Sequence, residues 1–302
     1  MGLALRRAGL LILALLIAIS PAVAAGEFVI IAPPGVTPGV YRTVQQAAER
    51  CIPLYAGYLR TRLSGQIEIH IFPTRTAFVR GRQTIAGESP EEAQRAADYL
   101  GSAINHSVLI NQATHEGSVP GELAGTTCHE ILHVYQFDLV TEDGRESHEW
   151  MLEGYAYFME KVALEHLGFE TLVISRGRAI RMLKVRPFEI RTSAIGGIGG
   201  GLFRVATITA AGRLLPRLAE MTTPDQFNAV GAHLGLAFPH YLFLMMDFLH
   251  NATSHNAFVA YFRAFAPNAG APWADDNFRA AFGMTVTDFQ LRVDVYIATL
   301  LR

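Results

Sequence analysis

Apolar residues recur at two different spacings along the first part of the chain, which predicts strands alternating with helices. Residues 66–72 (QIEIHIF) alternate polar and apolar side chains, as in a half-buried strand with His70 on its polar face. Residues 43–63 instead repeat apolar positions at helical spacing, and we expect Thr43 to cap this helix. The same reasoning predicts short strands at 27–32 and 107–110 and a further helix at 89–100.

Helical spacing dominates the remainder of the chain. Residues 122–139 and 149–167 are each predicted to form one helix, separated by a turn at 141–144. From Ala210 onward nearly all of the sequence is predicted to be helical, with helix starts near Pro224, Ser254, Pro272 and Thr285. The glycine-rich residues 196–201 are not followed by the Gly-Lys-Ser/Thr of a phosphate-binding loop, so we expect a flexible loop there.

Together these elements predict a single α+β domain over residues 25–302. An α/β part at 25–125 precedes two long helices at 126–167, and a mostly helical part follows at 168–302. The formal net charge of −2 and the absence of a block rich in lysine and arginine argue against a phosphate-binding face. We therefore expect no nucleic-acid partner.

The N-terminus has the order of a secretory signal peptide. Arg6 and Arg7 precede an apolar run at residues 10–19, and the small residues 22–25 follow Pro21. We expect cleavage near Ala24 or Ala25, and loss of residues 1–24 changes the net charge to 23 − 27 = −4. An uncleaved membrane anchor is the alternative, but the run is shorter than the roughly 20 apolar residues that a span needs.

We find no later segment in the sequence that is long and apolar enough to span a bilayer. The mature protein is therefore expected to have no stable membrane anchor and to be secreted or periplasmic.

The sequence contains two cysteines, Cys51 and Cys128, too few for a disulfide framework. We expect two small buried side chains, because a free cysteine is usually buried. An oxidising compartment would permit one bridge between them. A thiolate ligand at Cys128 is disfavoured, because the next helical position points about 100° away from His129.

Residues 127–136 (TCHEILHVYQ) carry the strongest chemical signal. On a helix, His129 and His133 lie one turn apart and differ in direction by only about 40°, so that both imidazoles can bind one zinc ion. Glu130 lies beside the first imidazole and can act as general base towards water. The apolar residues Ile131, Leu132 and Val134 around Glu130 and His133 indicate a buried, uninterrupted helix. A His-Glu-x-x-His string that arose by chance would rarely have this setting.

A catalytic zinc site needs a third protein ligand and an open position. Glu153 follows His133 by twenty residues, inside the second long helix (EWMLEGYAYFME), and is the predicted third ligand. We expect Gly154 and Ala156 to let this helix pack closely against the first.

The sequence resembles the gluzincin metallopeptidases, and it is most similar to their small exported peptidase MA-like domains. The resemblance is carried by His-Glu-x-x-His together with Trp150-x-x-Glu153-Gly154-x-Ala156. The resemblance implies a thermolysin-like fold, a bound Zn²⁺ and a peptide or protein substrate. Two features of the clan are absent. The Gly-x-Met-Glu-Asn motif of its large aminopeptidases is missing, and Tyr157 stands where thermolysin continues Glu-x-x-x-Asp.

Zinc hydrolases also need a donor for the oxyanion that forms on the attacked carbonyl. Our candidate is Tyr241, at the head of the apolar helical segment YLFLMMDFL; other candidates are His240, His233 and Arg204. We expect Tyr155 and Tyr157 to pack beside the third ligand. Partners that orient the two histidines are not identifiable from the pattern.

The leading hypothesis from these residues is an exported zinc metallopeptidase. One alternative is a zinc-binding interaction protein without catalysis, although such a site has no use for Glu130. Another is a zinc amidase that acts on cell-envelope peptides.

Overall fold

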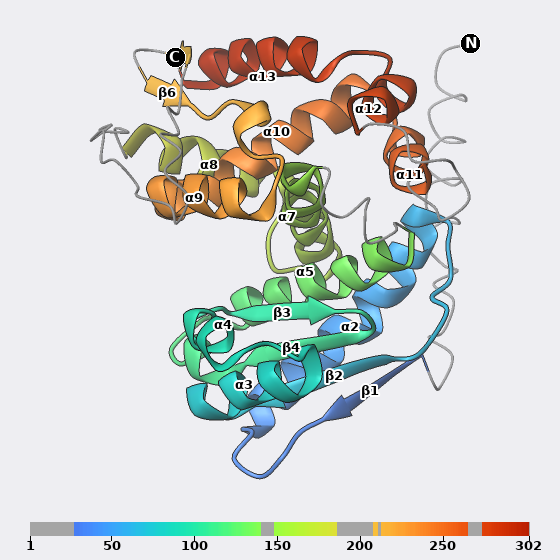
Figure 1. Ribbon diagram of the computed structural model, residues 1–302, viewed down its shortest axis with the longest axis vertical. Helices are drawn as coiled ribbons and strands as arrows, with labels where there is room; N and C mark the ends of the chain where they lie inside the picture. Colours follow the sequence, from blue (N-terminus) through green and yellow to red (C-terminus); the bar gives the residue numbers. More distant parts are fainter. Residues whose placement is uncertain (1–26, 140–147, 186–207, 211–212, 265–273, 302) are drawn as a thin grey trace, which may run out of the picture.

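The computed structural model describes residues 27–139, 148–185, 208–210, 213–264 and 274–301 (Figure 1). Five of the predicted features lie outside the described residues: the signal peptide at 1–24, the turn at 141–144, the loop at 196–201, Arg204 and the helix start at Pro272.

A four-stranded sheet forms the lower end of the molecule in Figure 1, in the order β1-β2-β4-β3. Strands β1 (Phe28–Ile31), β2 (Ile67–Phe72) and β4 (Ser107–Asn111) run parallel, and these three confirm the expected strands. Strand β3 (Gly101–Ile104) is antiparallel to β4 and forms one edge of the sheet. The sequence pattern missed β3, because four residues are too few to show alternation.

The helix predicted at 89–100 is shorter than expected. Ser89 caps α4 (Pro90–Arg95) through a capping box with Glu92, and the chain leaves the helix before it enters β3. Two further short helical elements precede it, α3 (Arg75–Gly81) and η1 (Arg82–Ala86), and η2 (Gln112–His115) follows β4.

Helix α2 (Pro38–Leu59) begins one and a half turns earlier than predicted. Its cap is Thr37, whose hydroxyl accepts from the backbone N–H of Val40, and not Thr43. Pro38 at the first helical position favours this start, because its fixed φ suits a helix and its missing N–H is not needed there.

Two long helices lie between the sheet and the C-terminal helices (Figure 1). They are α5 (Pro120–Leu139) and α7 (Glu149–His166), and both confirm the predicted helices closely. Helix α5 packs against α2, and a disulfide joins Cys51 of α2 to Cys128 of α5. Both side chains are buried as expected, but they are not free thiols. The alternative of one bridge holds, because the helix packing brings the two Cα atoms within 5.7 Å.

The C-terminal part is mostly helical, as expected, with one small hairpin of β5 and β6. Its elements are α8 (Leu172–Val185), β5 (Ile208–Ala210), β6 (Arg213–Leu215), η3 (Leu218–Glu220), α9 (Pro224–Leu234), η4 (Gly235–Ala237), α10 (Phe238–Ala252), α11 (His255–Arg263), α12 (Ala274–Phe282) and α13 (Val286–Leu301). Helix α10 forms the centre of this part and packs on α7, α8 and α13.

Gly154 provides a close approach between helices, but to a different partner from the one we expected. A Cβ added at Gly154 would lie 3.0 Å from Cε of Met246 and 3.6 Å from Cε of Met245, both on α10. Because Glu153 faces α5, the next residue lies about 100° further round α7 and faces α10 instead.

One stretch of the described chain, Pro224–Ala252, is long and apolar enough to cross a membrane by length and composition, contrary to our reading of the sequence. It comprises α9, η4 and α10, and Gly235 interrupts its α-helical backbone with a φ of 53°. More than half of its most apolar window, 56%, is buried inside the protein. Buried core helices can have the same length and apolar composition as a membrane span, and α10 occupies such a core position.

The structure thus has a sheet with helices in its N-terminal part and a helical C-terminal part, which confirms the α+β fold class at this level.

Candidate metal centre

Helices α5 and α7 bring His129, His133 and Glu153 together. Nε2 of His129 lies 3.1 Å from Nε2 of His133. The two carboxylate oxygens of Glu153 divide between them, Oε2 lying 3.3 Å from Nε2 of His129 and Oε1 3.3 Å from Nε2 of His133. Three ligand atoms therefore converge on one point, close enough to hold a metal ion.

The cluster is buried on the α5 side and opens to solvent beside α7. The His129 and His133 side chains are 9% and 8% exposed, whereas that of Glu153 is 25% exposed. The cluster is therefore more accessible from α7 than from α5.

Gln136 fixes the orientation of His133. Its Oε1 lies 2.7 Å from Nδ1 of His133, and its Nε2 donates to the backbone carbonyl of Leu152 over 3.0 Å. An amide oxygen can only accept, so Nδ1 of His133 carries the proton and Nε2 keeps its lone pair for a metal. Gln136 also ties α5 to the backbone of α7 next to Glu153.

Glu160 lies beside Nδ1 of His129, as Gln136 lies beside Nδ1 of His133. Its Oε2 lies 3.5 Å from Nδ1 of His129, at the outer limit of a hydrogen bond, and this nitrogen has no closer partner among the described residues. Gly125, one turn before His129 on α5, leaves the space that Glu160 occupies. A Cβ added at Gly125 would lie 3.0 Å from Oε1 of Glu160.

Sequence reasoning missed both of these orienting residues. Gln136 is three residues after His133, and Glu160 is seven after Glu153, so each lies on the same helix face as the ligand that precedes it. This spacing is the signal that could have identified them.

The electrostatics of the cluster favour positive charge at its centre. Burial alone would lower the pKa of His129, but ion pairing with Glu153 and Glu160 outweighs it and raises that pKa to about 10. Burial would raise the pKa of Glu160, yet Lys161 and His129 lower it to about 2, so that its carboxylate is ionised at neutral pH. The two carboxylates therefore stabilise a cation between the histidines.

Glu130 faces the sheet side of the cluster. It is buried, and burial raises its pKa, an effect that His129 and His133 partly offset. The edge strand β3 runs directly over it at Gly101. A Cβ added there would lie 2.9 Å from Cγ of Glu130 and 3.1 Å from Cγ2 of Thr126, so glycine leaves the room that the Glu130 side chain needs.

Two further side chains border the cluster. The ring of Tyr157, half-buried, lies with its centroid 4.6 Å from that of His129, which agrees with the expected packing beside the ligands. Glu149 precedes Glu153 by one turn of α7, and burial together with the charge of Glu153 raises its pKa to about 7. Tyr155, in contrast, is fully buried and packs on Phe258, away from the cluster.

The structure does not bring Tyr241 to the cluster. Its side chain is fully buried, and its hydroxyl donates to the carbonyl of Pro216 over 3.2 Å. A buried hydroxyl that is already bonded cannot reach a substrate carbonyl, so this geometry does not suit an oxyanion donor. His233 is exposed on α9, and His240 is half-buried with its pKa lowered to about 4 by burial and the nearby Lys161.

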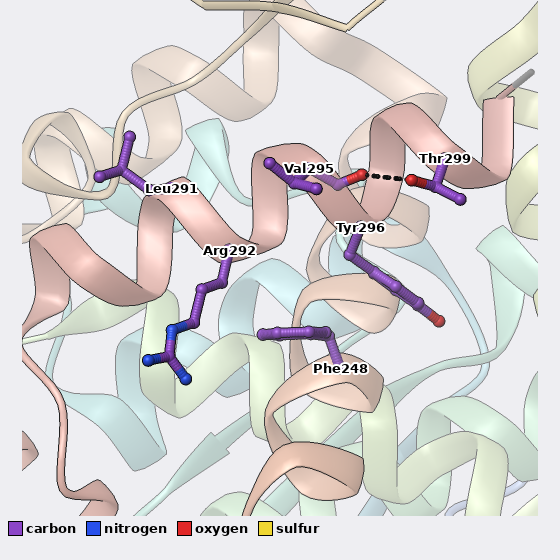
Figure 2. Close-up of a pocket in the computed structure, with 6 residues that line it drawn as sticks. All are labelled: Phe248, Leu291, Arg292, Val295, Tyr296 and Thr299. Atoms are coloured by element: carbon purple, nitrogen blue, oxygen red, sulfur yellow. Dashed lines mark hydrogen bonds between the residues drawn. The ribbon is translucent and has the colours of Figure 1, made fainter.

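A separate hollow of about 520 Å³ lies between α10 and α13 (Figure 2). It is lined by Phe248, Leu291, Arg292, Val295, Tyr296 and Thr299. None of these residues belongs to α5 or α7, so this hollow is not part of the metal centre.

No protein-family model matches the chain, and comparison with curated proteins finds no match either. The functional argument therefore rests on the geometry of the centre. Two imidazoles and a carboxylate converge, Gln136 orients His133, Glu160 lies 3.5 Å from His129, and the carboxylate of Glu130 stands beside the first imidazole.

Proposed function

We propose that this protein is a zinc-dependent metallopeptidase of the gluzincin type. The observation that carries the proposal is the convergence of Nε2 of His129, Nε2 of His133 and a carboxylate of Glu153, with Glu130 adjacent.

The donor set fits zinc. Zinc in proteins binds nitrogen and oxygen ligands at about 2.0–2.2 Å in tetrahedral geometry, which separates neighbouring ligand atoms by about 3.3–3.6 Å. The Nε2 atoms of His129 and His133 are 3.1 Å apart, and each lies 3.3 Å from a different oxygen of the Glu153 carboxylate, which is close to this spacing. Three protein ligands leave a fourth position open, which is the pattern of catalytic rather than structural zinc sites.

The residues of the centre then have distinct roles in peptide hydrolysis. Bound zinc would supply a Lewis acid that lowers the pKa of water to about 7 and polarises a carbonyl. Glu130 accepts the proton of the attacking water and passes it to the leaving amine. Gln136 and Glu160 hold the imidazoles with Nε2 facing the centre.

The position of β3 supports a peptide as substrate. It is an edge strand of the sheet, and its first residue, Gly101, lies against Glu130. An edge strand can pair with an extended peptide through backbone hydrogen bonds. A peptide added to β3 would run past the general base. An antiparallel edge strand beside the metal helix, followed by a helical part, also agrees with the proposed thermolysin-like fold.

Export agrees with the disulfide. Bridges between cysteines are rare in reducing compartments, and the Cys51–Cys128 bridge fits the secreted or periplasmic location that the N-terminal pattern predicts.

The proposal is tested by metal content and hydrolysis together. We expect about one zinc ion per chain in the mature protein, a sharp loss in Glu153→Ala, and cleavage of a fluorogenic peptide library. Glu130→Gln should keep its zinc and lose at least about 1,000-fold in kcat, since it removes the general base. Zinc binding without cleavage at any pH would favour the non-catalytic alternative. Full activity in Glu130→Gln would falsify the assignment of the base.

A further inference from the structure

The proposed reaction lacks a donor for the oxyanion. Attack of water on a peptide carbonyl moves the π electrons of the C=O bond onto its oxygen, and a preorganised N–H or O–H then stabilises that charge. Tyr241 is excluded from this role by its burial and by its bond to Pro216. Another donor must lie at the open side of the centre.

Tyr157 lies one turn after Glu153 on the same face of α7. Its ring packs on His129 at 4.6 Å with the ring planes 60° apart. The carboxylates of Glu153, Glu160 and Glu130 are all within electrostatic range of its hydroxyl. The phenol of Tyr157 therefore lies beside the ligand cluster, against the imidazole of His129.

The hydroxyl is also available. The Tyr157 side chain is half-buried, and its hydroxyl makes no hydrogen bond with any of the described residues. Tyr135 and Tyr241, by comparison, are buried and donate to backbone carbonyls. Solution phenols have a pKa near 10, so a tyrosine hydroxyl is a donor at neutral pH.

We infer that Tyr157 is a catalytic residue whose hydroxyl donates a hydrogen bond to the oxyanion of the tetrahedral intermediate. The inference rests on the proposed function and adds the group which that reaction lacks. The phenol keeps its proton throughout: the attacking water gives its proton to Glu130, and Tyr157 contributes a hydrogen bond that is made only once the carbonyl oxygen becomes charged. Contact with His129 fixes the ring for this purpose.

The test compares Tyr157→Phe with Tyr155→Phe. Each substitution removes one hydroxyl from α7. That of Tyr155 is fully buried, lies away from the cluster and has no hydrogen-bond partner within the described part of the chain. In Tyr157→Phe we expect kcat for peptide cleavage to fall by about 100-fold with little change in KM, which is typical for loss of an oxyanion donor. Zinc content and Tm should stay unchanged, and Tyr155→Phe should match the wild type.

A binding measurement separates a catalytic from a merely structural role. An N-phosphoryl dipeptide carries tetrahedral oxygens that resemble the intermediate, whereas acetohydroxamate is a planar metal chelator. By calorimetry on the zinc-loaded proteins, Tyr157→Phe should bind the N-phosphoryl dipeptide at least about 10-fold more weakly and acetohydroxamate equally well.

The outcomes distinguish the two claims. Equal kcat in the wild type and Tyr157→Phe, or equal weakening for both probes, would overturn the role of Tyr157 and leave the peptidase proposal intact. Zinc-loaded wild type that cleaves no peptide would overturn both.

Discussion

The carboxylate of Glu160 lies 3.5 Å from Nδ1 of His129, although Glu160 is two turns of α7 beyond the ligand Glu153. Tyr157 stands one turn after Glu153, and Glu160 stands on the turn that follows it. Gly125 on α5 provides the space for the Glu160 carboxylate.

Because a carboxylate on the outer nitrogen raises the basicity of a metal-binding imidazole, Glu160→Ala should weaken zinc binding by about 10- to 100-fold. Glu160→Gln, which keeps an acceptor without its charge, should be intermediate. Competition with a chromophoric chelator measures the affinity, and Glu91→Ala, at an exposed glutamate of α4, is the control. Equal affinity in all four proteins would contradict an orienting role for Glu160.

Gly101→Ala should impair catalysis and spare the metal. The added Cβ would lie 2.9 Å from Cγ of Glu130, so the side chain of this proposed general base has to move. Displacement of about 1 Å at a reacting group can cost about 100-fold in rate. Steady-state kinetics and zinc analysis check the result. Ser102→Ala is the matched control, since neighbouring residues of a strand point to opposite faces. Loss of zinc in Gly101→Ala would instead indicate a general disturbance of α5.

Replacing both Cys51 and Cys128 by alanine should lower the free energy of unfolding by about 4 kcal/mol, because the bridge closes a loop of 77 residues. Chemical denaturation of the two proteins measures the difference. Reductant should destabilise the wild type by a similar amount and leave the double variant unchanged. A reductant effect on both proteins would point to another cause.

Stability should fall in acid through His148. This side chain is 3% exposed, with Nδ1 2.7 Å from the hydroxyl of Tyr261 and Nε2 3.3 Å from Asp275. Burial lowers its pKa to about 4, although Asp275 opposes the shift. Between pH 6.5 and pH 4 the unfolded chain therefore binds more protons than the folded chain, and stability decreases as pH falls.

We expect this contribution to be on the order of 2 kcal/mol across that range. Denaturation midpoints of the wild type and His148→Gln between pH 4 and pH 8 provide the measurement. The variant should be less stable at pH 8 but have a shallower acid slope. Parallel slopes in the two proteins would assign the acid sensitivity to other groups.

The sequence predicted those parts of the site whose spacing reflects a single helix. His129, Glu130 and His133 lie within one turn or so of α5, so helical periodicity placed the two imidazoles on one face. Glu153 was assigned from the next long helix because a catalytic zinc site needs a third ligand. Gln136 and Glu160 were missed because glutamine and glutamate are common on exposed helix faces, and only the contact with an imidazole distinguishes these two.

Relationships between elements distant in the sequence could not be predicted in the same way. Tyr241 stands at the head of α10 with an apolar helix behind it, but which way it faces depends on packing against residues near Pro216. The pairing of Cys51 with Cys128 likewise depends on how α2 crosses α5. Strand β3 was too short to be recognised, although it places Gly101 over Glu130.

The disulfide-bonded Cys128 is the residue before His129. Oxidation of the two thiols therefore affects the helix segment that carries the metal cluster. In a reducing cytoplasm both thiols persist, and α5 is held against α2 by packing alone. If the chain is exported as we propose, oxidation after translocation would add a covalent link between α2 and the helix that carries His129 and His133. The bridge would then form only after the chain has left the reducing compartment.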